Sequence, residues 1–317
     1  MPSLSRAPVA PVRDWYCDSA HWEQFTPREG DVVIATAPKV GTTWTQQIVS
    51  LLVFQDPEPR HLGSLSPWLD CRFQIPLPVA LQLLEAQTHK RFVKSHLPMS
   101  ALPLWDEVKY IHVARDGRDA CMSYLNHING YTPLVWERLD ATGEADPLLP
   151  GPKPRPPRDT RGFFNHWIEK GGTRRAELMA DAFFEIGRSF WAERMRPNVL
   201  LLHYNDMKAD LDGEMRRIAA FLDIAVDETV WPDLVAAAEF SAMQRNGDTL
   251  MAGVDVAFDG GHRTFLNKGT NGRWQGELTD ADLALYRARV EAELSPGLAH
   301  WLEHGRRVAG DPRAAAD

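Results

Sequence analysis

The stretch DVVIATAPKVGTTW (residues 31–44) joins an apolar run to a turn rich in hydroxyl side chains. The run DVVIAT (31–36) is short, branched and uninterrupted, which is typical of a strand buried on both faces of a sheet. The turn contains Lys39 and Gly41 and leads into the apolar segment QQIVSLLVF (46–54). The stretch therefore predicts a strand, a loop and a helix, in that order.

Short apolar runs alternate with helical stretches along the rest of the chain. Further strands are expected at RFVKS (91–95), KYIHVA (109–114) and VLLLHY (199–204), and further helices at DGRDACMSYLNHI (116–128), 161–179, 183–195 and 211–223. Strands separated by helices are typical of a parallel sheet covered by helices. We therefore expect an α/β fold with a central parallel sheet flanked by helices.

Composition limits the class of protein. The chain has 317 residues, 44% of them hydrophobic and 25% charged, which suits one large globular domain or two small ones. No run approaches the roughly 18 apolar residues of a membrane-spanning helix, and the N-terminus MPSLSRAPVAPVRDWY lacks the apolar region of a signal peptide. We expect a soluble cytoplasmic protein without an integral membrane segment.

Cysteine spacing and charge exclude further classes. Cys17, Cys71 and Cys121 lie far apart and form no CxxC pair, so neither a disulfide framework nor a zinc site is expected. The formal net charge of −8 argues against binding to nucleic acid or to anionic membranes. An anionic ligand would therefore need a local cluster of basic side chains.

The segment DPLLPGPKPRPPRDT (146–160) is rich in proline, which disrupts both helices and sheets. It predicts an extended loop or flexible lid. The segment is too short to mark a domain boundary.

The loop after the first strand has the properties of an anion site. In open parallel sheets, ligands bind outside the carboxyl ends of the strands. Gly41 lets the backbone approach a ligand, and the free N–H groups near Thr42 and Thr43 open a helix, where anions are held well. Lys39 adds a positive charge. Lys39 precedes Gly41, whereas the lysine of the ATP-binding loop GxxxxGK[ST] follows its second glycine.

Two further loops place polar residues at the same edge of the sheet. In RFVKSHLP (91–98), Lys94 and His96 are two residues apart and hence share one face of the strand. A histidine in this position is a candidate general base, because imidazole titrates near neutral pH. In the third loop Arg115 follows a strand, although an arginine at a strand end often pairs with a neighbour such as Asp116.

Six segments resemble, in the same order, motifs of the cytosolic-type sulfotransferases that use 3′-phosphoadenosine 5′-phosphosulfate (PAPS). They are PKVGTTW (38–44), KSHLP (94–98), RDGRDACMS (115–123), HYNDMK (203–208), EFSAMQRN (239–246) and FLNKGTNGRW (265–274). The resemblance implies the P-loop-NTPase-like sulfotransferase fold. It also implies a single sulfotransferase domain over residues 1–317, with its core at about residues 30–280.

The resemblance further implies a role for each matching residue. His96 would be the general base, and Lys39 and Lys94 would be catalytic positive groups. The donor would be held by Lys39, Gly41, Thr42 and Thr43 at its 5′-phosphosulfate, by Trp44, Tyr204 and Phe240 at its adenine, and by Arg115, Ser123, Asn267, Lys268 and Gly269 at its 3′-phosphate. Without the resemblance, core packing would be the better interpretation for Trp44, and Tyr204 and Phe240 would suit a hydrophobic core equally well.

The sequence departs from the family pattern at several positions. Val40 stands where the family usually has serine, Ala238 replaces a threonine, Asn267 an arginine and Arg273 an aspartate. Either Arg263 or Arg273 is able to replace the charge missing at Asn267, and the two alternatives stay open.

The expected reaction is in-line displacement at sulfur, which moves the sulfuryl group of PAPS to an acceptor hydroxyl or amine and releases 3′-phosphoadenosine 5′-phosphate (PAP). No His/Cys set or acidic run is spaced for a metal, so no metal is expected. One alternative is a P-loop kinase for nucleotides or small molecules, which would need Mg²⁺. The other is a non-catalytic PAP-binding module, which the departures from the family pattern keep open.

The acceptor pocket is expected to be lined by residues 68–73, by the lid after Tyr131 and by residues 183–191. Their aromatic and aliphatic side chains indicate a small apolar acceptor, such as a phenol, an alcohol or a lipid. A polysaccharide would need a basic groove.

The family's dimer-forming pattern, KxxxTVxxxE, falls here on QGELTDADLA (275–284), where only Thr279 matches. We therefore expect no dimer through this segment. Thr279 and Asp282 are instead expected to cap the helix DADLALYRARVEAEL (280–294).

Overall fold

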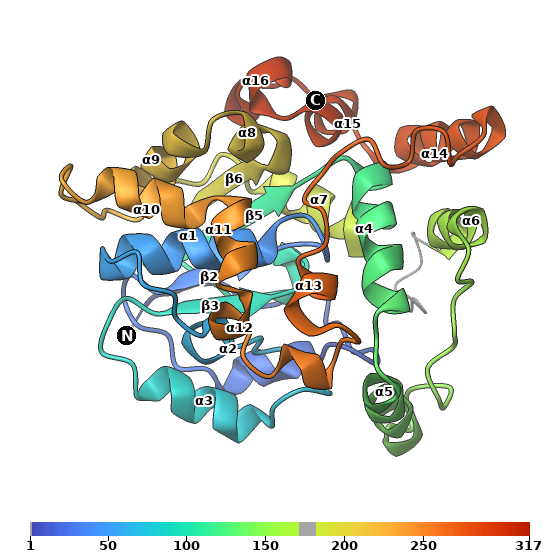
Figure 1. Cartoon of the computed structure of the whole chain (residues 1–317), viewed down its shortest axis with the longest axis horizontal. Coiled ribbons are helices and arrows are strands. Elements are labelled where there is room, and N and C mark those ends of the chain that lie inside the picture. Colours follow the sequence, from blue (N-terminus) through green and yellow to red (C-terminus); the bar gives the residue numbers. More distant parts are fainter. Residues whose placement is uncertain (1, 171–181) are drawn as a thin grey trace.

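Four short parallel strands form the centre of the protein in a computed structural model, which describes residues 2–170 and 182–317 (Figure 1). Their order along the sheet is β3 (Phe92–Ser95), β2 (Val32–Ala35), β5 (Lys109–Ala114) and β6 (Val199–His203). Each strand lies within a run predicted from the sequence, and all neighbours pair in parallel. The predicted α/β fold with a central parallel sheet is confirmed.

The strands are buried because both faces of the sheet carry apolar side chains. All four residues of β2 have no exposed surface. Val32 in β2 lies opposite Phe92 in β3 on one side and Lys109 in β5 on the other. The loops that follow β2, β3 and β5 therefore leave the same edge of the sheet next to one another.

Helices flank the sheet in two groups (Figure 1). In the first group, α1 (Thr42–Phe54) packs against β2 and β3, and α9 (Leu211–Phe221) and α10 (Trp231–Ala238) pack on α1. α1 and α9 were predicted from the sequence.

The second group contains α4 (Gly117–Asn129), α6 (Thr160–Lys170), α7 (Ala182–Ala192) and α14 (Asp280–Glu293). α6 packs against both α4 and α14, and α7 packs against β6. These helices match the predicted ones, except that much of the predicted helix 161–179 lies outside the described residues.

The remaining elements are short and mostly outside the predicted segments. β1 (Leu4–Arg6) and β4 (Leu104–Trp105) form a separate antiparallel pair that was not predicted. The other helices are η1 (Ser19–Gln24), α2 (Leu62–Leu65), α3 (Leu77–Glu85), η2 (Met99–Ala101), α5 (Pro133–Ala145), α8 (Tyr204–Ala209), α11 (Phe240–Arg245), α12 (Gly247–Leu250), η4 (Val254–Val256), α13 (Gly261–Phe265), α15 (Pro296–His304), α16 (Arg306–Ala309) and η5 (Pro312–Ala314). No helix within the described ranges is long and apolar enough to cross a membrane.

The proline-rich segment contains no helix or strand between residues 146 and 159, as expected. Hydrogen bonds tie it to the N-terminal region and to Arg72. Asp146 accepts hydrogen bonds from Arg13 (2.6 Å) and Arg72 (2.7 Å), and Trp15 donates its indole N–H to the Gly151 carbonyl at 2.9 Å. Its role as a lid stays a prediction.

α14 begins with the predicted capping box. The Asp282 amide donates to the Thr279 hydroxyl at 3.3 Å, and the Thr279 amide donates to the Asp282 carboxylate at 2.8 Å. The two bonds satisfy amides that a helix start otherwise leaves free. The absence of a dimer through residues 275–284 stays a prediction.

A buried ion pair ties together the amino ends of β2 and β3. Arg91 donates from Nε to Asp31 Oδ1 at 2.9 Å and from Nη2 to Asp31 Oδ2 at 2.5 Å. The side chains of Arg91 and Asp31 are only 1% and 2% exposed. Because neither charge has access to bulk water, each depends on the other.

We predict that Arg91→Met lowers the free energy of unfolding by about 3–5 kcal/mol, because Asp31 is left as a buried charge without its partner. Urea denaturation followed by circular dichroism measures the change. The double variant Asp31→Leu/Arg91→Met removes both charges and should recover most of the loss. A loss below about 1 kcal/mol for the single variant would contradict the prediction.

Candidate functional site

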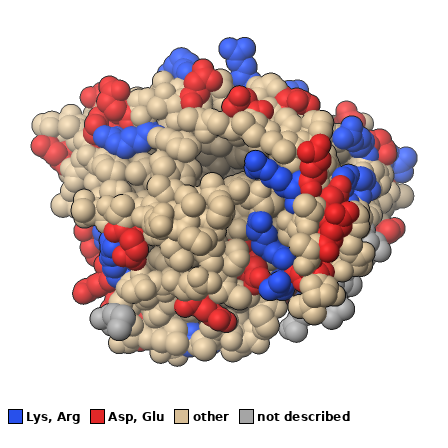
Figure 2. All heavy atoms as spheres, turned by 90° about the horizontal axis from the view of Figure 1, so that it is seen from below, with Lys and Arg blue, Asp and Glu red and all other residues tan. Residues whose placement is uncertain are grey.

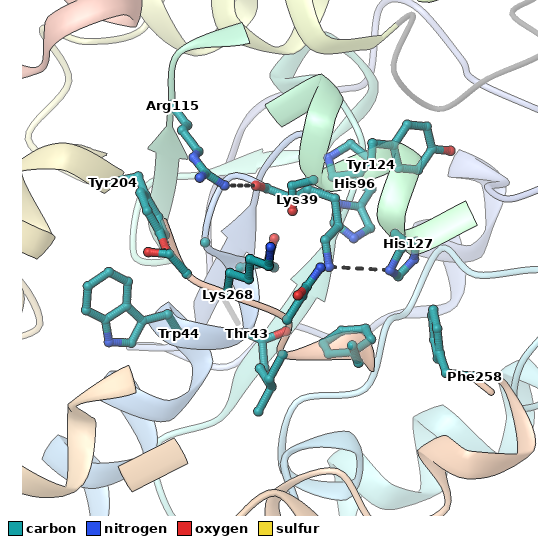
Figure 3. Close-up of a pocket in the computed structure, with 18 of the residues that line it drawn as sticks. Lys39, Thr43, Trp44, His96, Arg115, Tyr124, His127, Tyr204, Phe258 and Lys268 are labelled. Atoms are coloured by element: carbon teal, nitrogen blue, oxygen red, sulfur yellow. Dashed lines mark hydrogen bonds between the residues drawn. The ribbon is translucent and has the colours of Figure 1, made fainter. Parts of the chain in front are cut away.

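One cavity lies at the carboxyl edge of the central sheet (Figure 3). The loops after β2, β3 and β5 border it, together with α4 and the segment 265–273. Every residue that the resemblance assigned to catalysis or to donor binding lines this cavity, namely Lys39, Gly41, Thr42, Thr43, Trp44, Lys94, His96, Arg115, Ser123, Tyr204, Phe240, Asn267, Lys268 and Gly269. The fold thus brings together side chains from distant parts of the chain.

Positive charge is concentrated at the cavity although the chain is acidic overall. Its described lining includes five basic side chains (Lys39, Lys94, Arg115, Lys268 and Arg273) and one acidic residue, Asp119. Figure 2 shows a hollowed face with Lys and Arg side chains at one side of the hollow and Asp and Glu side chains farther out beside them. A local basic cluster is what an anionic ligand would need on a protein with a net charge of −8.

Lys39 and Gly41 shape the loop after β2. The backbone angle φ is 67° at Lys39 and 121° at Gly41, in the region that favours glycine. A Cβ atom at Gly41 would lie only 3.2 Å from Cδ2 of Tyr204. α1 begins at Thr42 without a side-chain cap, while the hydroxyls of Thr36 and Thr42 share a hydrogen bond of 2.5 Å. An uncapped helix N-terminus, with its partial positive charge, therefore lies at the cavity.

The side chain of Lys39 extends into the cavity. Its Nζ lies 3.3 Å from Nδ1 of His127 and 4.4 Å from the centroid of the Phe265 ring (Figure 3). Burial, followed by the charges of Lys94 and Arg115, lowers the pKa of Lys39 to about 7. A nearby anion would reverse this effect by favouring the charged ammonium.

His96 lies directly after β3 and is 8% exposed. Its Nδ1 lies 2.7 Å from the Thr36 carbonyl oxygen, and its ring packs edge-on against Trp68 with centroids 4.7 Å apart. Since a carbonyl only accepts, the imidazole proton lies on Nδ1 and Nε2 keeps a lone pair. Burial and the charge of Lys94 hold the pKa of His96 well below its ordinary value, so the ring is neutral at neutral pH.

Lys94 lines the cavity beside His96. Its Nζ lies 4.5 Å from the centroid of the Trp68 ring. Burial lowers its pKa from the ordinary value. The aromatic ring gives the ammonium a favourable contact in a poorly hydrated place.

Arg115 binds protein groups as well as facing the cavity. It donates to the Asn271 side-chain oxygen at 2.8 Å, to the Thr270 carbonyl at 2.9 Å and to the Lys39 carbonyl at 3.2 Å. The guanidinium also lies 4.2 Å from the centroid of the Tyr204 ring. Arg115 therefore connects the loop after β2 to the C-terminal segment, a function that the sequence did not indicate.

Three aromatic residues line the same side of the cavity. Trp44 donates its indole N–H to the Ala238 carbonyl at 2.7 Å, and its ring meets that of Tyr204 edge-on at 5.4 Å. Gly269 has φ of 62°, and a Cβ atom there would lie 2.9 Å from the ring of Phe240. The glycine thus allows the C-terminal segment to pass close over an aromatic ring.

The C-terminal part of the lining is held by its backbone. Gln244 donates to the Asn267 carbonyl at 2.8 Å, and Lys208 donates to the Gly269 carbonyl at 2.8 Å. These bonds occupy carbonyl groups and leave the side chains of Asn267 and Lys268 facing the cavity.

The positions that depart from the family pattern have different surroundings. Val40 is 1% exposed and belongs to the hydrophobic core, and Ala238 is fully buried and contributes its carbonyl to Trp44. Asn267 and Arg273 line the cavity, whereas Arg263 does not. Arg273 is therefore the better placed of the two arginines to supply the missing charge.

Sequence reasoning missed His127, which lies on α4 four residues after Ser123 and lines the cavity with it. Its ring lies among those of Tyr131, Phe258 and Phe265, with centroids 5.1, 4.6 and 5.5 Å away. The four-residue spacing, which places two residues on one helix face, was the available signal.

The prediction that residues 183–191 line the acceptor pocket is wrong. Residues 183–191 belong to α7, where Phe183, Phe184 and Phe190 are buried in the core, and none of residues 183–191 lines the cavity. Trp68, Phe73 and Tyr131, from the other two expected segments, do line it.

We predict that the affinity for PAP falls as the pH rises above 7, by up to about ten-fold per pH unit, because the anion binds the charged form of Lys39. Calorimetry between about pH 7.5 and 9 measures this above the range in which phosphate itself titrates. A Lys39→Arg variant keeps its charge and should show little dependence on pH. The same decline in both proteins would assign the titration to another group.

Comparisons with known proteins identify the family. The model of the sulfotransferase domain matches residues 29–296. A glycolipid sulfotransferase of Mycobacterium bovis is 33% identical over 93% of this chain and 94% of its own length. Human sulfotransferase 1C2 is 27% identical over 86% of this chain and 88% of its own. Retinol dehydratase, solved in a complex with retinol and PAP, has a TM-score of 0.68 at 24% identity and covers 88% of this chain and 85% of its own, which shows the same fold. The chain belongs to the sulfotransferase family.

Proposed function

We propose that this sulfotransferase moves the sulfuryl group of PAPS to a hydroxyl of a small acceptor with an apolar body, and that His96 is the general base. The observation that carries the proposal is that Nδ1 of His96 lies 2.7 Å from the Thr36 carbonyl oxygen, which leaves Nε2 as an acceptor, while His96 lines the same cavity as Lys39 and the start of α1. Transfer from a phosphosulfate to a hydroxyl needs a base and an anion site next to each other.

The residues present fit the donor. The uncapped start of α1 and Lys39 suit the 5′-phosphosulfate, and the close approach at Gly41, where a Cβ atom would meet Tyr204, leaves a backbone cradle. Trp44 and Phe240 offer ring surfaces to the adenine, together with Tyr204.

A second group of polar residues suits the 3′-phosphate. Ser123, Lys268 and the Gly269 amide would bind it. Arg115 would add those N–H groups that do not already bond to Lys39, Thr270 or Asn271. Arg273 would supply the positive charge that Asn267 lacks.

The proposed reaction balances in one displacement. The acceptor oxygen forms a bond to sulfur while the bond between sulfur and the 5′-phosphate oxygen breaks. His96 Nε2 takes the acceptor proton, and the phosphate keeps the electron pair as PAP leaves. Lys39 and the N–H groups at the start of α1 stabilise the charge that develops on this phosphate, and Lys94 adds positive potential beside His96.

Support for an apolar acceptor comes from the walls of the cavity near His96. Trp68 packs on His96, and Phe73 meets Trp68 edge-on with centroids 5.8 Å apart. Phe258 and Phe265 lie on the side of His127. The mycobacterial relatives named glycolipid sulfotransferases favour a lipid among the apolar acceptors considered.

A transfer assay tests the proposed function. We expect the protein to move labelled sulfate from PAPS to members of a panel of phenols, alcohols and glycolipids. Family membership favours this outcome over the kinase alternative. Mg²⁺-dependent turnover of ATP without sulfate transfer would support a kinase, and PAP binding without any transfer would support a non-catalytic module.

We predict that His96→Ala lowers turnover by about two to four orders of magnitude, the usual contribution of a general base, and leaves PAP affinity nearly unchanged. Steady-state kinetics and calorimetry measure the two quantities. His112 provides a matched control, because it also bonds a backbone carbonyl (Ala35, 3.0 Å) but lies outside the cavity lining. His112→Ala should affect stability rather than turnover per folded molecule. A His96→Ala rate above about a tenth of the wild-type rate would remove His96 from the mechanism.

A further inference from the structure

Two imidazoles line the cavity, and their Nδ1 atoms meet opposite kinds of partner. Nδ1 of His96 lies 2.7 Å from a carbonyl oxygen, that of Thr36, whereas Nδ1 of His127 lies 3.3 Å from the ammonium nitrogen of Lys39 (Figure 3). A carbonyl group only accepts hydrogen bonds, and an ammonium group only donates them.

These partners place the single proton of each ring on a different nitrogen. In His96 the proton lies on Nδ1, and Nε2 is an acceptor. When Lys39 is charged, the form that a bound anion favours, it donates to Nδ1 of His127, so the proton of His127 lies on Nε2, which is a donor. Burial and the nearby lysines hold the pKa of both imidazoles well below the ordinary value, so both rings are neutral.

Lys39 is able to serve His127 and an anion at the same time. An ammonium group has three N–H donors, and one of them is enough for His127. Binding of an anion favours the charged form of Lys39, which strengthens the assignment of the proton in His127 to Nε2. The assignment of the His127 proton to Nε2 is therefore strongest when PAPS or PAP is bound.

Within residues 2–170 and 182–317, the Nε2–H group of His127 has no hydrogen-bond partner, and the ring lines the cavity. Its ring neighbours Phe258 and Phe265 offer only carbon faces. A polar group in such a place normally finds a hydrogen-bond partner, so a ligand oxygen is the fitting one.

We propose that His127 donates its Nε2–H to a second oxygen of the acceptor molecule, while His96 takes the proton of the hydroxyl that receives sulfate. The proposal rests on the proposed function. It assigns His127 the role of a specificity residue and makes the acceptor a molecule with at least two oxygens at its reactive end, such as a glycoside. The aromatic rings around His127 suit the C–H faces of a sugar ring.

Octyl β-D-glucopyranoside and 1-octanol test this assignment, because they share an alkyl chain and differ in the number of oxygens. We expect the wild-type protein to have the higher kcat/KM for the glucoside. His127→Phe should lower the ratio of the two kcat/KM values by about 10- to 100-fold, the cost of leaving a hydrogen bond unmade inside a cavity that a ligand fills. The ratio of the two kcat/KM values is the quantity to compare. If His127→Phe acted only through Lys39, it would lower kcat/KM for both acceptors equally and leave the ratio unchanged.

His127→Gln is the matched variant, because its amide accepts from Lys39 and also donates. It should keep more of the wild-type ratio than His127→Phe. PAP-dependent thermal stabilisation shows that each variant is folded and binds nucleotide.

Two outcomes overturn the role of His127 while the proposed function stands. One is an unchanged ratio in folded His127→Phe, and the other is a wild-type protein that sulfates 1-octanol but not the glucoside. If PAP binds and no acceptor of the wider panel receives sulfate, the proposed function itself fails, and the role of His127 fails with it.

Discussion

The parallel direction of all four central strands is the constraint on which the site depends. Parallel strands end at one edge of the sheet, so the loops after β2, β3 and β5 meet there. β2 lies between β3 and β5, and its loop therefore reaches both Lys94 and Arg115. At the opposite edge, the buried pair of Arg91 and Asp31 joins the starts of β2 and β3. The ion pair helps to fix how β2 and β3 align at their amino ends. This alignment in turn sets where the loops that follow the two strands lie at the opposite edge.

Electrostatic repulsion links the protonation states within the cavity. Burial and the neighbouring charges of Lys94 and Arg115 lower the pKa of Lys39 to about 7. Lys39 and Lys94 in turn help to keep His96 and His127 neutral. An anionic ligand relieves the repulsion between Lys39, Lys94 and Arg115. The cluster proposed to bind an anion thus also helps, after burial, to keep His96 neutral, which the proposed role of His96 as a base requires.

The two ends of the cavity are built by different interactions. Around the proposed nucleotide site, hydrogen bonds hold backbone segments in place, and Arg115 links Lys39 to Thr270 and Asn271. Around the proposed acceptor site, edge-on aromatic contacts such as that between Trp68 and Phe73 dominate. Hydrogen bonds define direction sharply, whereas aromatic walls accept ligands of different shape.

The sequence by itself determined the elements whose causes are local. The apolar strands, the loop of Lys39 and Gly41, and the capping box of Thr279 with Asp282 arise from residues close together in the chain. The tertiary structure decided the pairings between distant residues, such as Lys39 with His127, 88 positions apart. It also placed Phe183, Phe184 and Phe190 in the core instead of the pocket, because core and pocket both take apolar side chains and only packing distinguishes them. Sequence patterns show which side chains avoid water, but the partner against which each one packs is set by the assembly of all elements.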